Sequence, residues 1–284
     1  MTTAPVNIVF GGTGGIGSAL CRLLDARGVR LVVVGRAEDS LRALADSLPN
    51  ITTVQADATI SDDVRRVFDL AAEKFGGVDG VAHCVGSLLL KPAHLTTDDE
   101  WGATLLTNLT SAFHVVRAAT AVMMRRPAGG SIVLVSSSAA QFGIANHEAI
   151  AAAKAGVIGL ARSAAATYAR QKVRVNCVAP GLTRTPLTAT LTANPASLAA
   201  STAMHALGRI AEPDEVASAI AWLLEPANNF ITGQVIAVDG GLGSLQPRFV
   251  QPTISRSRAK KSSSSVPVRA DWLQPSSSPR PACG

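Results

Sequence analysis

A glycine-rich segment near the amino terminus has the residue types and spacing needed to bind a pyrophosphate. In VFGGTGGIGSAL (residues 9–20), Gly11, Gly15 and Gly17 follow a β-rich run and begin a helical one. Glycine permits a tight turn and a close approach of backbone N–H groups, and the positive end of a helix attracts phosphate. Because a strand precedes this loop and a helix follows it, the segment predicts a dinucleotide site.

Arg36 is the residue that should distinguish NADP(H) from NAD(H). It ends the second β-rich run, 19 residues after Gly17. An NAD site places a carboxylate there to accept from the ribose 2′-hydroxyl, whereas a guanidinium attracts a 2′-phosphate. The sequence therefore favours NADP(H). The alternative is NAD(H), with Arg36 at the surface and Glu38 or Asp39 binding the ribose.

These groups need a framework that alternates strands with helices. Such alternation predicts an α/β fold, a Rossmann-type doubly wound sheet of seven parallel strands in a single domain over residues 1–245. Residues 186–208, interrupted by Pro195, should cover the ligand crevice at the carboxyl ends of the strands. The seven β-rich runs are 6–10, 30–35, 51–56, 80–86, 131–136, 173–178 and 234–239.

Composition and charge exclude several other classes. Residues 246–284 hold seven Lys or Arg and one acid, so the net charge of +6 lies in this segment and the folded part is neutral. Nucleic-acid binding is therefore not indicated. We predict this basic Ser- and Pro-rich tail to be disordered, with a weak contact to an acidic partner as the alternative.

The sequence also predicts the compartment. It has no run of 18 uncharged apolar residues and no signal-peptide pattern, so we expect a cytoplasmic protein with no membrane span. The four cysteines lack paired spacing, which favours reduced thiols over disulfides. We expect no metal site.

Several motifs, in the same order, resemble those of the short-chain dehydrogenase/reductase family over residues 5–243. GGTGGIG is similar to its cofactor loop, QADAT to the segment that meets adenine, and VNCVAPGLTRT to the loop over the nicotinamide. TNLTSAF, IVLVSSSAAQFG and ITGQVIAVDGG match further family motifs, whereas AHCVG matches the usual Asn-Asn-Ala-Gly only at its glycine. The resemblance implies a cofactor site formed by Gly11, Thr13, Gly14, Gly15, Ile16, Gly17, Arg36, Asp57, Ala58, Cys84, Gly86, Lys154, Pro180, Gly181 and Thr185.

The resemblance fails at one catalytic position. The family has a serine, a tyrosine thirteen residues later and a lysine four further on, which implies Ser137 and Lys154 here, supported by Asn108. Ile150 occupies the tyrosine position. Isoleucine cannot protonate the oxygen that gains charge as hydride reaches a carbonyl, a contribution of about 10²–10⁴ in rate. Tyr168 is 14 residues beyond Lys154 on the same expected helix, which is a distance of about 21 Å along the axis, so it cannot take the place of the tyrosine.

His147 is the candidate replacement for the missing tyrosine. It lies seven residues before Lys154, nearly two helical turns, so both can face one side of a helix. The related enoyl-acyl-carrier-protein reductases have their tyrosine at this spacing from the lysine. Histidine titrates near neutral pH and can donate a proton, and Glu148 could orient the ring. The alternative is a surface or helix-capping histidine.

Together these features imply an NADP(H)-dependent oxidoreductase acting on a carbonyl or hydroxyl group of a small molecule. Two alternatives stay open: a catalytically weak nucleotide-binding sensor or subunit, and an enoyl-thioester reductase that uses His147. The resemblance also implies a homodimer or homotetramer through the helix expected near 148–170. We expect His83 and Cys84 to pack near the adenosine, and His205 to lie in the cover.

Overall fold

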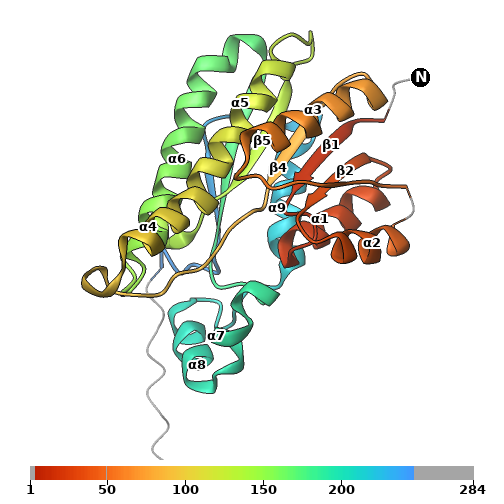
Figure 1. Cartoon of the computed structure of the whole chain (residues 1–284). Coiled ribbons are helices and arrows are strands. Elements are labelled where there is room, and N and C mark those ends of the chain that lie inside the picture. The colour runs from red at the N-terminus through yellow and green to blue at the C-terminus, as the bar shows by residue number, and fades with distance from the viewer. Residues whose placement is uncertain (1–3, 49, 246–284) are drawn as a thin grey trace, which may run out of the picture. The chain divides into compact units, whose positions relative to one another are not determined.

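Apolar strands alternate with amphipathic helices, and the computed structural model, which describes residues 4–48 and 50–245, assembles them into one parallel sheet between helical layers (Figure 1). The spatial order is β3-β2-β1-β4-β5-β6-β7, with every pair parallel. The predicted seven-stranded doubly wound sheet is confirmed. The strands are β1 Val6–Phe10, β2 Arg30–Gly35, β3 Thr52–Gln55, β4 Gly80–His83, β5 Gly130–Val135, β6 Val173–Pro180 and β7 Val235–Val238.

Two strands differ from the predicted runs by more than one residue at an end. Strand β4 ends at His83, three residues early, because the chain after it leaves the sheet to border a cavity. Strand β6 continues to Pro180, two residues beyond the prediction, because β7 pairs with it as far as that residue. The predicted tail over 246–284 lies outside the described residues.

The described residues form nine α-helices, several with clear start or stop signals. Helix α9 begins at Pro213, and Glu212 and Glu215 cap each other's backbone N–H groups before it. Helix α3 ends at Phe75, and its C-cap residue Gly76 has a left-handed backbone conformation. The helices are α1 Gly15–Ala26, α2 Glu38–Ser47, α3 Ser61–Phe75, α4 Asp98–Leu105, α5 Ser111–Met123, α6 Glu148–Tyr168, α7 Ala189–Ala193, α8 Pro195–Met204 and α9 Pro213–Leu224.

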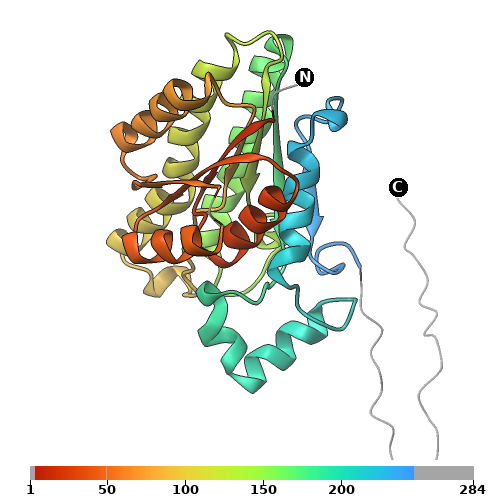
Figure 2. The same ribbon diagram turned by 90° about the vertical axis from the view of Figure 1, so that its right-hand side faces the viewer.

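Alternate residues of each strand face opposite helical layers. In β1, Ile8 and Phe10 belong to the core beneath α3, α5 and α6, whereas Val9 belongs to the core beneath α1, α2 and α9. Figure 2 shows the two layers on either side of the sheet. Because both faces are covered, the strands are almost continuously apolar.

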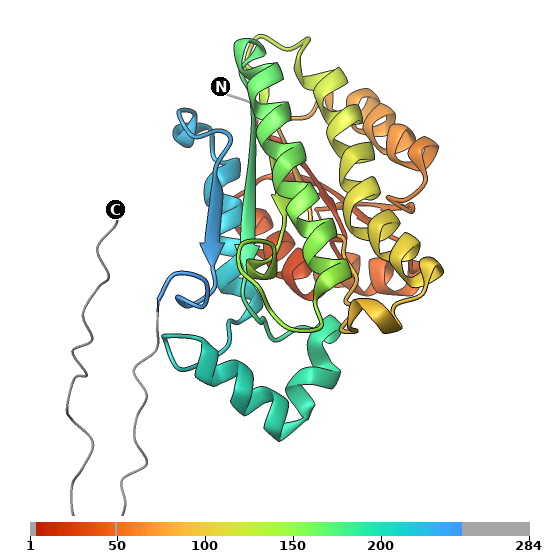
Figure 3. The same cartoon turned by 90° about the vertical axis from the view of Figure 1, so that its left-hand side faces the viewer.

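Helix α6 crosses one face of the sheet and is seen in front in Figure 3. With the following turn (Glu148–Gln171) it is long and apolar enough to span a membrane by length and composition, with a mean hydropathy of 1.3. Half of that window is buried within the fold, and the helix packs on β6 and α5. Packing on the sheet thus accounts for the apolar side of α6.

Helices α7 and α8 project beyond the carboxyl ends of the strands (Figure 1). The Asn194 side chain accepts from two backbone N–H groups at the start of α8, and Pro195 occupies its first turn. The predicted interruption at Pro195 is therefore the start of a second lid helix.

Candidate active site

The amino terminus of α1 is an open site for an anion. Its N-cap is Gly14, no side chain caps the helix, and its first turn contains no acidic residue. Backbone N–H groups at the positive end of a helix are left without partners unless a side chain, water or ligand binds them. The terminus therefore fits a pyrophosphate.

Two glycines shape the loop that leads into α1. Gly11 has a φ of +72°, in the left-handed region that glycine adopts readily. At Gly17 a Cβ atom would lie 2.2 Å from the Gly11 carbonyl oxygen, so only glycine lets the helix meet the turn this closely. The loop thus has the compact form that a phosphate-binding turn requires.

A cavity of about 180 Å³ beside this loop is lined by Thr13, Arg36 and Asp57, among others. Arg36 is exposed at the end of β2. The neighbouring carboxylates Glu38 and Asp39 lie near the Arg42 guanidinium, at 2.9 Å and 3.7 Å. These exposed pairs are weak, and Arg36 is the one Lys or Arg in the described lining of this cavity. The other predicted residues that line it are Gly11, Gly14, Ala58, Cys84 and Gly86.

The β4 end supplies two residues with strongly perturbed acidity. His83 is fully buried, with Nε2 2.9 Å from Ser111 Oγ. Burial, and then the charge of Lys154, lowers the pKa of His83 to about 3, so the ring is neutral. Burial raises the pKa of the Cys84 thiol to about 12, which leaves it unreactive. Both are compatible with the predicted packing role beside the cavity that Cys84 lines.

Asn108 lies in a π-helical turn between α4 and α5 (Leu106–Thr110) and is fully buried. Its Oδ1 accepts from the Ser87 backbone N–H at 3.1 Å, and its Nδ2 donates to Ser87 Oγ at 2.8 Å. A Cβ on Gly86 would lie 3.1 Å from Asn108 Oδ1 and 3.4 Å from Lys154 Nζ. Asn108 thus holds the loop after β4 and lies near Lys154, without a direct hydrogen bond to it.

A second cavity, of about 270 Å³, collects the residues predicted to carry the chemistry. Ser137, His147 and Lys154 all line it, together with Ile150. The predicted cofactor residues Ile16, Pro180, Gly181 and Thr185 line it as well. A Cβ on Gly15 would lie 2.7 Å from Thr185 Cγ2, so the phosphate loop and this cavity adjoin.

Lys154 is a buried amine at the floor of this cavity. It is 6% exposed, and its Nζ donates to the Val135 carbonyl at 2.9 Å. Burial lowers the pKa of Lys154 to about 8, although the Cys84 and Cys177 thiols oppose this shift. The amine is therefore poised to lose or keep its proton near neutral pH.

The buried amine predicts a dependence of stability on pH. Between pH 8 and the unperturbed value of 10.5, the unfolded chain binds a proton that the folded protein has released. The free energy of unfolding of the ligand-free protein should therefore rise with pH in this window, by up to about 3 kcal/mol relative to Lys154→Met. Urea denaturation of both proteins at pH 7 and pH 10.5 measures the difference. An unchanged difference between the two pH values would contradict the burial of a charged amine.

Ile150 is 4% exposed and presents an apolar side chain to the cavity where the family resemblance expects a phenol. Tyr168, at the other end of α6, packs against the core beneath α3 and α5. The sequence prediction that Tyr168 cannot replace the missing group is consistent with this placement.

His147 occupies the N-cap position of α6, where its side chain makes no capping hydrogen bond, and it is half-buried in the cavity wall. Its Nδ1 lies 2.8 Å from the Ala145 carbonyl, so Nδ1 carries the proton of the neutral ring and Nε2 is left for a ligand. Asn146 before it has a φ of +62°, a left-handed conformation that asparagine tolerates. Its carbonyl accepts from the Lys91 N–H at 2.8 Å, which ties together two segments of the cavity wall.

His205 lies in the lid, as predicted, but its ring serves the fold. It is 2% exposed; Nδ1 lies 2.6 Å from the Ser201 carbonyl, and Nε2 accepts from the Leu182 N–H at 3.3 Å. Both nitrogens are therefore bound to backbone, so the ring connects α8 to the loop after β6. This arrangement leaves no nitrogen for a substrate.

Comparisons with known proteins agree with this geometry. The family described as Enoyl-(Acyl carrier protein) reductase matches residues 11–243. The cis-4-hydroxycyclohexanecarboxylate dehydrogenase of Sinomonas cyclohexanicum is 40% identical over 244 residues, covering 83% of this chain and 95% of that protein. A short-chain type dehydrogenase/reductase from Mycobacterium ulcerans superposes with a TM-score of 0.81 at 32% identity, covering 87% and 93% of the two chains. The chain belongs to the short-chain dehydrogenase/reductase family.

As a member of the short-chain dehydrogenase/reductase family, the chain is an oxidoreductase of small molecules with a carbonyl or hydroxyl group. The structure of ElxO with NADP bound has a TM-score of 0.81 and 26% identity, and covers 86% of this chain and 100% of that one. This neighbour agrees with the NADP(H) expected from Arg36. The roles of individual residues remain predictions.

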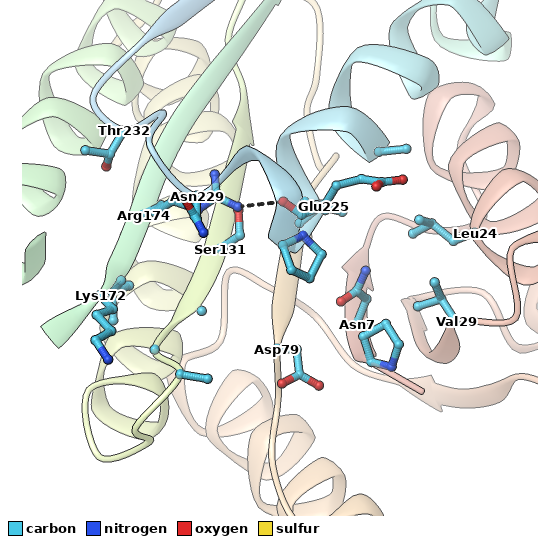
Figure 4. Close-up of a pocket in the computed structure, with 18 of the residues that line it drawn as sticks. Asn7, Leu24, Val29, Asp79, Ser131, Lys172, Arg174, Glu225, Asn229 and Thr232 are labelled. Atoms are coloured by element: carbon cyan, nitrogen blue, oxygen red, sulfur yellow. Dashed lines mark hydrogen bonds between the residues drawn. The ribbon is translucent and has the colours of Figure 1, made fainter. Parts of the chain in front are cut away.

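Another cavity, of about 590 Å³, lies at the opposite end of the strands, where they begin (Figure 4). In its wall, the Arg174 guanidinium donates to the carbonyl oxygens of Leu223, Glu225 and Ile231 at 2.9 Å, 3.3 Å and 3.1 Å. Arg27 pairs with the Glu225 carboxylate at 2.6 Å. These bonds join the carboxyl end of α9 to β6 and to the end of α1. The residues around this cavity therefore stabilise the fold.

Sequence reasoning missed two parts of the site. The first is Asn146, which turns the chain into α6; an asparagine directly before a helix start is a signal for a left-handed residue. The second is the set of apolar side chains in the cavity wall, which periodicity could not separate from ordinary core residues. They are Leu88, Leu90, Ile144, Leu187, Leu191 and Met204.

Proposed function

We propose that the chain is an NADP(H)-dependent reductase of small-molecule carbonyls in which His147 supplies the proton that Ile150 cannot. One observation carries this proposal: Ser137, His147 and Lys154 line a single cavity that adjoins the phosphate loop. The three come from different segments, after β5 and along α6. Only their shared cavity makes them a candidate catalytic group.

Each residue has a chemical role in this proposal. NADPH, when bound, supplies the hydride. Ser137 Oγ accepts from the Ala139 N–H at 3.2 Å, so its own hydrogen is free to donate to the substrate oxygen. The protonated His147 ring keeps Nδ1–H on the Ala145 carbonyl and donates its other proton from Nε2 to the same oxygen. Lys154 Nζ would donate to the nicotinamide ribose, and Asn108 would position the loop beside it.

Replacing Arg36 by aspartate tests the proposed cofactor preference. Loss of a guanidinium–phosphate bond and the new repulsion should weaken NADPH binding by about 10–100-fold. NADH binding should stay unchanged or improve, because a carboxylate accepts from the ribose hydroxyls. Fluorescence titration with each nucleotide measures both affinities, and Arg42→Asp on the neighbouring helix is the matched control. An unchanged NADPH affinity in Arg36→Asp would assign the phosphate to another residue.

Enoyl-thioester reduction is the second candidate, favoured by the matched family description and by the position of His147 seven residues before Lys154. A panel of ketones and short enoyl thioesters, followed by NADPH absorbance, distinguishes the two reactions. Turnover of the thioesters alone would replace the carbonyl proposal. NADPH binding without any turnover would instead indicate the nucleotide sensor.

We also infer that the chain forms a homo-oligomer through α5 and α6, which lie side by side in Figure 3. The outer side of α6 is exposed at the small residues Ala155 and Gly159. Next to it, Leu106 and Phe113 are 45% and 44% exposed. Small residues allow close helix contact and the larger ones supply apolar area, so light scattering should find a dimer or tetramer.

The cytoplasmic location remains a prediction. The described cysteines, Cys21, Cys84 and Cys177, are free thiols, which is compatible with a reducing compartment.

A further inference from the structure

The walls of the reaction cavity are apolar away from the reacting groups. Apolar side chains line the cavity from four separate segments of the chain. These segments are the loop after β4, the loop before α6, α7 with the turn before it, and α8. The lid residue Leu187 is 55% exposed and Met204 is 42% exposed, so both are available to a ligand. Exposed apolar side chains gathered around one cavity mark a site for an apolar ligand.

Much of the polar lining is bound within the protein. Ser136 Oγ donates to the Lys154 carbonyl at 2.8 Å, and Ser138 Oγ to the Asp239 carboxylate at 3.1 Å. The Thr188 hydroxyl is likewise bound to backbone carbonyls of its own loop, and both His205 nitrogens are bound to backbone. Ser137 and His147 keep donors for the reacting oxygen, and Ser87 and Ser201 carry the other lining hydroxyls that donate no hydrogen bond within the described residues.

The described cavity lining offers no free Lys or Arg side chain for an anionic substrate. Lys154 is the one Lys or Arg in that lining, and its Nζ is bound to the Val135 carbonyl beside the expected nicotinamide ribose. Lys91, directly after the lining residue Leu90, pairs with Glu100 at 2.8 Å. Arg184 in the loop after β6 pairs with Glu212 at 3.1 Å. The proposed function assigns the protonated His147 to the reacting oxygen, so a carboxylate elsewhere in the cavity would lose its hydration without gaining a cationic partner.

The cavity volume limits the size of the substrate. At about 270 Å³ it is slightly smaller than most ligand pockets, and residues of the expected nicotinamide region line it too. A cavity of this size favours a small compound, such as one with a single ring.

We infer that the substrate is a neutral, mainly apolar carbonyl or hydroxyl compound of about one ring, and that anionic analogues are rejected. This inference rests on the proposed function of the same cavity. It separates the chain from its relative of Sinomonas cyclohexanicum, whose name specifies a carboxylate. The inferred difference in substrate charge follows from the side chains of the cavity wall and does not require a difference in fold.

Calorimetric titration of the full chain tests the inference in two stages. The first stage titrates NADP⁺ alone, and absence of binding there would overturn the proposed function. The second titrates cyclohexanone or 4-oxocyclohexanecarboxylate into the NADP⁺ complex, where no hydride can transfer. We expect cyclohexanone to bind at least about tenfold more tightly than the acid. Equal or tighter binding of the acid, or no binding of either compound at millimolar concentration, would overturn the inference while leaving the cofactor assignment intact.

A gain-of-charge variant sharpens the test. Leu187→Arg places a guanidinium in the lid wall of the cavity and should tighten the binding of 4-oxocyclohexanecarboxylate by about tenfold, through a charge-assisted pair. Leu207→Arg is the matched control, because Leu207 is 68% exposed and lies outside this cavity lining. If both variants gain equally, the effect is one of net charge and the inferred wall contact is wrong.

Discussion

His147→Ala should lower kcat for carbonyl reduction by about 10²–10⁴-fold while leaving NADPH affinity unchanged, because it removes the proton donor without touching the phosphate loop. Steady-state kinetics of both proteins together with NADPH titration measure kcat and the cofactor affinity.

Ile150→Tyr in the His147→Ala background is the matching rescue experiment. A phenol at position 150, one helical turn before Lys154, would enter the same cavity and restore a donor beside the amine. We expect at least about a tenfold recovery of kcat. If His147→Ala alone keeps its rate within about twofold, the proton comes from elsewhere, and a water bound near Lys154 becomes the candidate.

Gly17→Ala should weaken NADPH binding by on the order of 100-fold. Its Cβ would lie 2.2 Å from the Gly11 carbonyl oxygen and 2.9 Å from the Gly12 Cα, both backbone atoms that cannot rotate away. The start of α1 must therefore move off the turn, and steric strain of about 1–3 kcal/mol is typical of such overpacking. Fluorescence titration measures the affinity, and circular dichroism with thermal unfolding shows whether the fold persists.

Gly102→Ala provides the control for this substitution. Gly102 lies within α4, and a Cβ there would meet no atom within 4 Å. Alanine should stabilise that helix slightly and leave NADPH binding unchanged. Comparable loss of affinity in both variants would show that the effect at Gly17 is not local to the phosphate loop.

The sequence by itself determined the parts of this protein that depend on short-range patterns. The strand periodicity predicted all seven strands and their parallel arrangement, because parallel strands buried on both faces need a continuous apolar run. The glycines at 11 and 17 predicted the phosphate loop, because their conformation and close contact are local requirements. The count from Lys154 also located Ile150 at the position that lacks a phenol.

Only the tertiary structure decided which of the candidate side chains share a cavity. His147 and Ser137 are ten residues apart, and their common access to the space above Lys154 depends on how β5, α6 and the left-handed turn at Asn146 come together. In the same way, no pattern in the sequence shows that His205 is bound through both ring nitrogens or that the lid lining is apolar. Hydrogen bonding and cavity lining are set by contacts between distant segments, and a one-dimensional pattern does not contain those distances.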